Sequence, residues 1–367
     1  MLKTAIIFLA LGSLCLAQPI EKPRIEFSPK KYICFRTDHQ LSIDGKLEEP
    51  AWGKAKWTDD FVDIEGPSKP APRFRTRAKM LWDEKYFYIA AELSEPDIWG
   101  TLKNRDDIIF YDNDFEIFID PNGDTHSYSE FEINALNTFW DLFLKEPYRD
   151  INKAALHGWD IKGILTGVAV YGTLNKPGDT DSCWTVEVAF PWEAFKEIAD
   201  VNMPPQNNDQ WRINFSRVEW KTEVRDNKYQ KQINPETNKP YAEDNWVWSP
   251  QGIVNMHYPE MWGYVQFSDK SAGSQQISFI EKEEEVAKWL LREIYYAERI
   301  YFQTNGIFST ELKDLGIELK PINGFSSPPK IEITTNLFEA SLRSDDGSQI
   351  VHIRYDGLTW ITNLKGN

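Results

Sequence analysis

Successive runs of alternating apolar and polar residues between residues 114 and 144 are the feature that most constrains how this chain folds. Within 114–120, Phe115, Ile117 and Ile119 are apolar and most residues between them are acidic. A period of two is typical of a half-buried β-strand. A Pro-Asn-Gly-Asp turn follows, and two further strand-like runs come after it. The pattern predicts three neighbouring strands in an antiparallel meander.

This meander is expected to gather polar side chains on one surface. Glu116, Glu132 and Asn134 share the same side of the alternation, and Phe110 and Tyr111 stand just before the first strand. Carboxylates and amides can hydrogen-bond to sugar hydroxyls, and aromatic rings can stack on the apolar faces of pyranoses. The sequence therefore predicts a carbohydrate-binding face here.

The rest of the chain divides into two parts. Residues 18–270 contain many short alternating segments and abundant aromatic residues, which predict a mainly β, antiparallel β-sandwich of the immunoglobulin or jelly-roll type. From residue 281, apolar residues recur at three- and four-residue spacing up to Gly306, and three strand candidates follow. Residues 271–367 are therefore expected to form a small α+β unit. It either packs on the sandwich or stands alone as a module that binds a protein partner.

The first residues have the pattern of an export signal. Lys3 precedes a short apolar run, and Cys15 and Ala17 are the small residues before a cleavage site, so residues 1–17 are predicted to be a signal peptide. Acylation of Cys15, as in a lipoprotein, is the alternative. No later stretch resembles a membrane span. The mature protein is expected to be periplasmic, cell-surface or extracellular.

Charge and cysteine content narrow the range of partners. The formal net charge is −16, and loss of Lys3 with the signal makes it −17. Such acidity disfavours nucleic acids and anionic membranes, and suits neutral glycans and cations such as Ca²⁺. Cys34 and Cys183 remain after cleavage. They could form a disulfide in an oxidising compartment, or be two separate buried thiols.

Five segments, in their order and approximate spacing, resemble family 9 carbohydrate-binding modules. They are IDGKLEEPAW, LWDEKYFYIAAEL, DNDFEIFIDP, WTVEVAFPWEAF and PEMWGYVQF, and the resemblance spans residues 33–268. It implies an antiparallel β-sandwich without catalytic activity. It also implies a sugar clamped between two aromatic rings, with calcium ions held structurally.

The resemblance also suggests individual site residues. Glu116 matches the carboxylate that binds sugar hydroxyls, and Phe110 or Tyr111 stands where the family usually has Trp. The polar position on the next strand is Glu132 or Asn134, where an Arg is expected. Trp262 stands at the place of a late-strand aromatic.

Further candidates follow from the residues themselves. Trp140 and Trp220 lie beside loops or on strands of mixed polarity, and Arg217 neighbours Trp220, so these three are added to the predicted carbohydrate-binding set. Four acidic residues could hold structural Ca²⁺, whose preferred ligands are oxygens: Asp112, Asp114, Asp120 and Asp124. The last two belong to a sequence that is more typical of an ordinary hairpin turn than of a calcium loop.

Three functions are compatible with this sequence. The main prediction is a secreted, non-catalytic carbohydrate-binding protein. A glycan hydrolase using the acidic strand face is an alternative, because glycosidases need paired carboxylates. A cell-surface scaffold that binds no sugar is the third.

Overall fold

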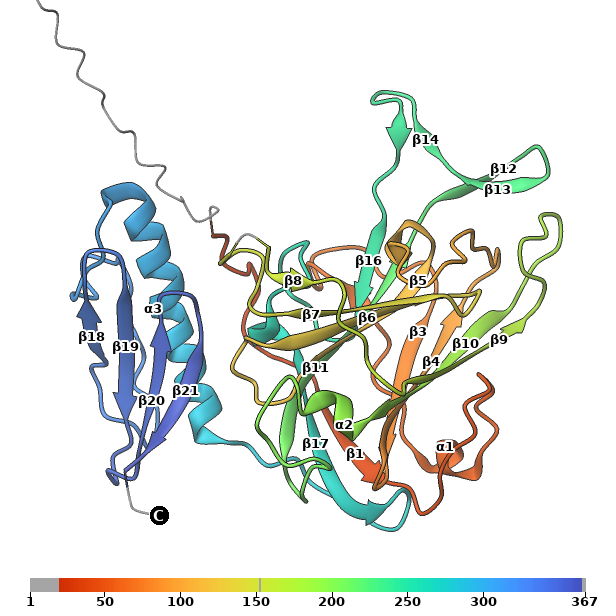
Figure 1. Cartoon of the computed structure of the whole chain (residues 1–367). Helices are drawn as coiled ribbons and strands as arrows, with labels where there is room; N and C mark the ends of the chain where they lie inside the picture. Colours follow the sequence, from red (N-terminus) through yellow and green to blue (C-terminus); the bar gives the residue numbers. More distant parts are fainter. Residues whose placement is uncertain (1–19, 152, 365–367) are drawn as a thin grey trace, which may run out of the picture.

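A computed structural model describes residues 20–151 and 153–364, so the predicted signal peptide lies outside the described residues. One long sheet folds over itself into the two layers of a β-sandwich (Figure 1). The first layer contains, in sheet order, β8 (Ala155–Leu156), β7 (Phe139–Leu144), β6 (Tyr128–Asn134), β5 (Asp114–Asp120), β11 (Gln210–Glu219) and β17 (Gly263–Ser271). In addition, β16 (Asp244–Val247) pairs with β11, and β2 (Val62–Asp63) pairs with β16. The second layer contains β1 (Lys31–Arg36), β3 (Thr76–Trp82), β4 (Tyr86–Ser94), β10 (Cys183–Pro191) and β9 (Leu165–Tyr171). The predicted β-sandwich is confirmed.

Strand β1 joins the two layers, and its pairing differs from the prediction. It runs parallel to β17, with Cys34 opposite Phe267, and parallel to β3, with Phe35 opposite Leu81. The sequence predicts an antiparallel sheet throughout, so these two parallel pairings are a correction. Two neighbouring strands can run parallel only when a long connection joins them, and the residues between β1 and β3 provide it. A tight hairpin would make the pair antiparallel.

The main core lies between the layers. Apolar side chains at alternate positions of β5, β6 and β11 meet those of β3, β4 and β10. Trp192 and Trp211 are buried there with ring centroids 5.7 Å apart in an edge-to-face arrangement. Such aromatic contacts add specific packing energy to the burial of apolar area. The period of two seen in the sequence thus separates a core side from an outer side on each strand.

Short elements connect these strands. They are α1 (Pro50–Lys54), η1 (Ile109–Tyr111), α2 (Trp192–Phe195) and η2 (Pro259–Met261). The polar stretch between β11 and β16 forms two hairpins, β12 (Thr222–Arg225) with β13 (Lys228–Lys231) and β14 (Ile233–Asn234) with β15 (Lys239–Pro240). Both hairpins extend away from the sandwich (Figure 1).

The C-terminal unit is a helix packed on a four-stranded antiparallel sheet. The helix is α3 (Glu283–Asn305), and the strands are β18 (Lys330–Ile333), β19 (Phe338–Arg343), β20 (Gln349–Arg354) and β21 (Thr359–Asn363). Gly306 ends the helix with φ 70°, and its amide donates to the Phe302 carbonyl (2.8 Å), as expected for a glycine cap. The sheet has one strand more than the sequence suggests.

This unit packs on the sandwich rather than standing apart. Tyr258 and Met261, which precede β17, belong to the same buried cluster as the apolar face of α3. The arm before β1 joins them, because the rings of Phe27 and Trp289 stack at 4.1 Å. The buried Glu260 carboxylate of the sandwich accepts hydrogen bonds from Arg149 (2.9 and 3.0 Å) and also from the Tyr296 hydroxyl of α3. Of the two arrangements that the sequence leaves open, the structure therefore has the C-terminal unit packed on the sandwich.

Two further expectations concern the whole chain. Cys34 and Cys183 are free thiols on β1 and β10, so of the two alternatives the structure has the separate thiols, with Cys34 buried and Cys183 half-buried. Each belongs to a different strand and is engaged in its own pairings, Cys34 with Phe267 and Cys183 with Ser94. Among the described residues, no helix combines the length and apolar character needed to cross a membrane.

Candidate functional site

The outer face of β5, β6 and β11 carries the predicted acidic surface. Glu116 lies opposite Glu132 on β6 and opposite Ser216 on β11. Asp114 lies opposite Asn134, and Glu132 lies opposite Trp140 on β7. Because side chains alternate between the faces of a strand, these residues share one surface while Phe115 and Ile117 enter the core.

The carboxylates on this surface are buried. Asp114, Glu116, Glu130 and Glu132 each expose no more than 7 per cent of their surface. Carboxylate oxygens of Asp114, Glu116 and Glu132 all lie within 4.8 Å of one another. The sequence cannot distinguish this arrangement from an ordinary solvated acidic face.

Burial and mutual repulsion determine the protonation of the cluster. Burial raises the pKa of Glu116 to about 7. Burial, together with the charge of neighbouring carboxylates, raises the pKa of Asp114, Glu130 and Glu132 well above their usual values. Burial thus favours the protonated form of these groups, and a protonated carboxyl group can donate as well as accept hydrogen bonds.

Aromatic side chains stand beside the cluster at η1. The Phe110 amide donates to Glu132 Oε2 (3.0 Å), and the rings of Phe110 and Tyr111 are 4.7 Å apart. Tyr111 is 51 per cent exposed, whereas Phe110 is half-buried against Trp220. The Trp220 indole donates to the Phe110 carbonyl (2.8 Å), and Lys231 Nζ lies 3.2 Å from the centre of the Trp220 ring. Tyr111 is thus the ring available to a ligand at this end.

A second aromatic group lies at the other side of the acidic cluster. Trp140 stacks on His157 with an interplanar angle of 7°. His257 Nε2 is 3.9 Å from Glu130 Oε2, and the exposed Tyr148 packs its ring on His257 at 4.5 Å. Burial raises the pKa of Tyr148 to about 12, and the charges of Glu130 and Glu132 add to that effect.

Four residues near the site were not predicted from the sequence: Lys231, Tyr148, His157 and His257. Lys231 lies on the projecting hairpin β12–β13, and burial lowers its pKa to about 8. The other three lie in the irregular segments after β7 and before η2. No period marks such segments, so only the fold brings them to the acidic cluster.

Arg217 and Trp262 lie elsewhere, which corrects the predicted set. Arg217 is on the core side of β11, fully buried, with Glu95 (2.8 Å) and Glu219 (2.8 Å) as ion-pair partners. Trp262 is also buried, packs on Phe118, and donates its indole N–H to the Met256 carbonyl (2.8 Å). Neither side chain is accessible to a sugar.

Asn134 lies on the predicted face, but its amide is occupied. Its Nδ2 donates to the Leu102 carbonyl (2.9 Å) and to Asp112 Oδ2 (3.0 Å), and its Oδ1 accepts the amides of Leu136 and Thr138. The side chain therefore shapes the turn after β6.

The four predicted calcium ligands do not form one site. Asp112 accepts four donors, among them the Thr101 amide (2.7 Å) and hydroxyl (2.7 Å). Asp120 and Asp124 accept backbone amides of the turn that follows β5. Asp114 differs, because its Oδ2 is buried without a hydrogen-bond partner among the described residues. Of the four, Asp114 is the residue whose surroundings fit a cation, together with Glu116 and Glu132.

Comparison with known proteins identifies the class to which this sandwich belongs. Residues 43–269 match the family described as carbohydrate family 9 binding domain-like. The match covers more than half of the chain, so the chain belongs to this family of carbohydrate-binding modules. The predicted family is confirmed, and a domain of this family is a binding module without catalytic activity.

Two curated relatives match part of the chain. Over 131 residues it is 36% identical to endo-1,4-beta-xylanase C of Paenibacillus barcinonensis, covering 34% of this chain and 11% of that protein. Over 100 residues it is 30% identical to exoglucanase XynX of Acetivibrio thermocellus, covering 27% and 8%. The chain thus spans about a tenth of the length of these relatives.

Solved structures are similar to the chain as well. One of them is a family 9 carbohydrate-binding module from Caldicellulosiruptor kristjanssonii in complex with cellotriose, with a TM-score of 0.41 and 15% identity. The similarity covers 69% of this chain and 100% of that one.

Proposed function

We propose that the outer face of β5, β6 and β7 binds an oligo- or polysaccharide reversibly, without turnover. The observation that supports this is the group of buried carboxylates, Glu116, Glu130 and Glu132, with the exposed ring of Tyr111 beside it. Partly protonated carboxyl groups can donate to and accept from sugar hydroxyls, and a tyrosine ring can stack on a pyranose face.

We propose β-1,4-linked glucan and xylan as the first ligands to test. The names of the two curated relatives, an endo-1,4-beta-xylanase and an exoglucanase, support this choice. The aromatic residues on two sides of the acidic cluster, Tyr111 and Trp140, favour a ligand of more than one ring. Affinity is expected to be modest, because association entropy offsets much of the gain from a few hydroxyl contacts.

The test is calorimetric titration of the full chain with cello- and xylo-oligosaccharides. Tyr111→Ala and Glu116→Gln should weaken binding by about tenfold or more, since each removes a contact of roughly 1–3 kcal/mol. Tyr171→Ala is the matched control, because Tyr171 on β9 is 44 per cent exposed on the other layer. Binding that is unchanged in Tyr111→Ala and Glu116→Gln would place the sugar elsewhere.

Product analysis of the same protein–oligosaccharide mixtures tests the hydrolase alternative. If the acidic face were catalytic, oligosaccharide products would accumulate with the natural chain, and Glu116→Gln would abolish turnover while sparing binding. A folded chain that binds none of the oligosaccharides in the calorimetric titration would instead favour the scaffold alternative.

We also propose that calcium, if the protein binds it, is bound by Asp114, Glu116 and Glu132 rather than by the turn after β5. Three carboxylates with one unpartnered oxygen support this assignment. Titration with Ca²⁺ in Asp114→Asn and Asp124→Asn tests it, because only the first should lose binding.

We propose that the protein is exported and that residues 1–17 are removed. The signal-like residues at the start of the chain and membership of the family support this. A mature protein that begins at Gln18 by mass spectrometry is the expected result, and retention of Met1 in the exported protein would contradict it.

A further inference from the structure

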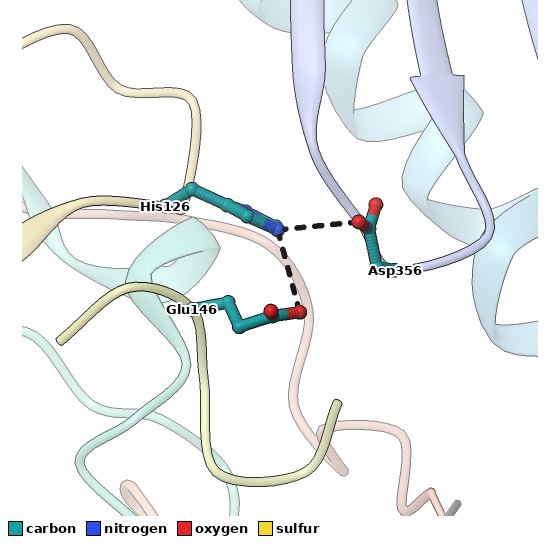
Figure 2. A group of neighbouring side chains, drawn as sticks. All are labelled: His126, Glu146 and Asp356. Atoms are coloured by element: carbon teal, nitrogen blue, oxygen red, sulfur yellow. Dashed lines mark ion pairs between the residues drawn. The ribbon is translucent and has the colours of Figure 1, made fainter. Parts of the chain in front are cut away.

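Three side chains from distant parts of the sequence meet where the C-terminal unit contacts the sandwich (Figure 2). His126 lies between β5 and β6, Glu146 follows β7, and Asp356 follows β20. His126 Nε2 is 3.8 Å from Glu146 Oε2 and 3.6 Å from Asp356 Oδ2. Both distances exceed those of a hydrogen bond between nitrogen and oxygen. Figure 2 shows the imidazole edge directed toward both carboxylates.

The surroundings of His126 determine which ring nitrogen carries a proton. The Thr125 hydroxyl donates its proton to the Gly357 carbonyl (3.0 Å), so toward His126 Nδ1 (3.4 Å) it can act only as an acceptor. Nδ1 therefore carries hydrogen, and in the neutral ring Nε2 carries a lone pair. Metal-binding histidines are commonly oriented in this way, with the second nitrogen donating to an oxygen.

Nε2 is buried and unpartnered. His126 is 8 per cent exposed, and Nε2 has no hydrogen-bond partner among the described residues. The Glu146 carboxylate likewise accepts no hydrogen bond from the part of the chain that the structure describes. Asp356 is oriented by Arg354, whose Nε donates to both of its oxygens (2.8 and 2.9 Å). A lone pair that faces two carboxylates is unfavourable, and either a proton on Nε2 or a cation bound between the three groups relieves it.

We propose that His126, Glu146 and Asp356 bind a divalent cation of the zinc class, which fastens the C-terminal unit to the sandwich. One imidazole nitrogen and two carboxylate oxygens are the donors that zinc accepts, with water completing the coordination. Calcium prefers oxygen donors alone, so it is disfavoured at this site. Two ligands come from the sandwich and one from the C-terminal unit, so the cation stabilises the contact between them.

The experiment titrates Zn²⁺ into chelator-treated full chain and measures heat and thermal unfolding. One binding site and a rise in Tm of roughly 5 °C at about a hundred times Kd are expected. His126→Gln and Glu146→Gln should each remove both signals. Glu146→Gln should disturb the fold less than His126→Gln, because the Glu146 side chain is partly exposed and almost isosteric with glutamine.

The chain offers a matched control for this test. His352 Nδ1 lies 2.7 Å from Glu339 Oε1 in the C-terminal sheet, a histidine–carboxylate pair that belongs to no three-ligand cluster among the described residues. Glu339→Gln should leave the zinc response unchanged.

Three results would overturn the proposal. The first is a natural chain that shows no zinc response, together with a Glu146→Gln variant whose loss of stability is the same with and without chelator. That outcome would mean that a protonated His126 bridges the two carboxylates directly. The second is an equal response to Ca²⁺, and the third is full zinc binding in both His126→Gln and Glu146→Gln.

Discussion

Glu116 and Glu132 lie directly opposite each other on β5 and β6, and both carboxylates are buried. Like charges in such a pair destabilise a sheet unless they are protonated, hydrogen-bonded or matched by a cation. Glu132 accepts the Phe110 amide, and the pKa of Glu116 is raised to about 7 by burial. Burial thus perturbs the protonation of this pair, and carboxyl groups with perturbed pKa values are common where a protein binds a ligand.

The first prediction concerns the pH dependence of stability. Because the pKa of Glu116 is raised in the folded state to about 7, from an ordinary 4.5, folding favours its protonated form. Its contribution is fully present below about pH 4.5 and is lost as the pH rises through 7. Glu116→Gln should therefore be more stable than the natural chain by roughly 1–3 kcal/mol at pH 8 and nearly equal to it at pH 5. Urea unfolding at both pH values measures the difference, and an equal difference at both would contradict the raised pKa.

The second prediction concerns the buried guanidinium of Arg217. It pairs with Glu95 and Glu219, so Arg217→Met leaves the buried Glu95 carboxylate without its counter-charge, and leaves Glu219 with only the longer contact to Arg73 (3.9 Å). We expect a loss of roughly 3–5 kcal/mol in the free energy of unfolding. Arg225→Met is the control, because the Arg225–Glu223 pair is exposed and should contribute less than about 1 kcal/mol. Equal effects of the two variants on urea midpoints would be inconsistent with this role.

Arg217 also illustrates what the sequence can and cannot predict. The alternation in β11 that places Trp211 and Phe215 in the core places Arg217 on the same side. The charged side chain of Arg217 can occupy a core position because Glu95, more than a hundred residues earlier in the sequence, supplies the opposite charge. Such a partner cannot be seen in a single sequence, so Arg217 was assigned to the binding face.

The acidic face itself was predictable, because a period of two determines which side chains share a surface. Glu116 and Glu132 are therefore found opposite each other, as the sequence predicts. Their burial was not predictable. It depends on segments without a period, including those that carry Tyr148 and His257, and on the fold that brings them together.

The third prediction concerns the contact between the sandwich and α3. Burial alone would raise the pKa of Glu260, but Arg149, Arg292 and the Tyr296 hydroxyl lower it to about 2. The resulting stability is present above about pH 4.5 and is lost as the pH falls toward 2. Glu260→Gln should cost roughly 3–5 kcal/mol at pH 7, and less as the pH falls below 4.5.

Thermal unfolding of Glu260→Gln and of the natural chain between pH 2.5 and 7 measures this effect. Glu332→Gln is the control, since Glu332 pairs with Lys330 at an exposed position. A difference in Tm for Glu260→Gln that stays constant over the whole pH range would show that its carboxylate is not ionised in the folded state.

The fourth prediction concerns the N-terminal arm. Phe27 stacks on Trp289 of α3 at 4.1 Å with an interplanar angle of 6°, so the arm covers the helix that follows the sandwich. Phe27→Ala removes this ring contact and part of the apolar burial around it, and we expect a loss of about 2 kcal/mol. Leu337→Ala is the control, because Leu337 is exposed. Faster amide exchange in α3 for Phe27→Ala alone is the expected result, whereas exchange equal to that of the natural chain would mean that the arm does not stabilise the helix.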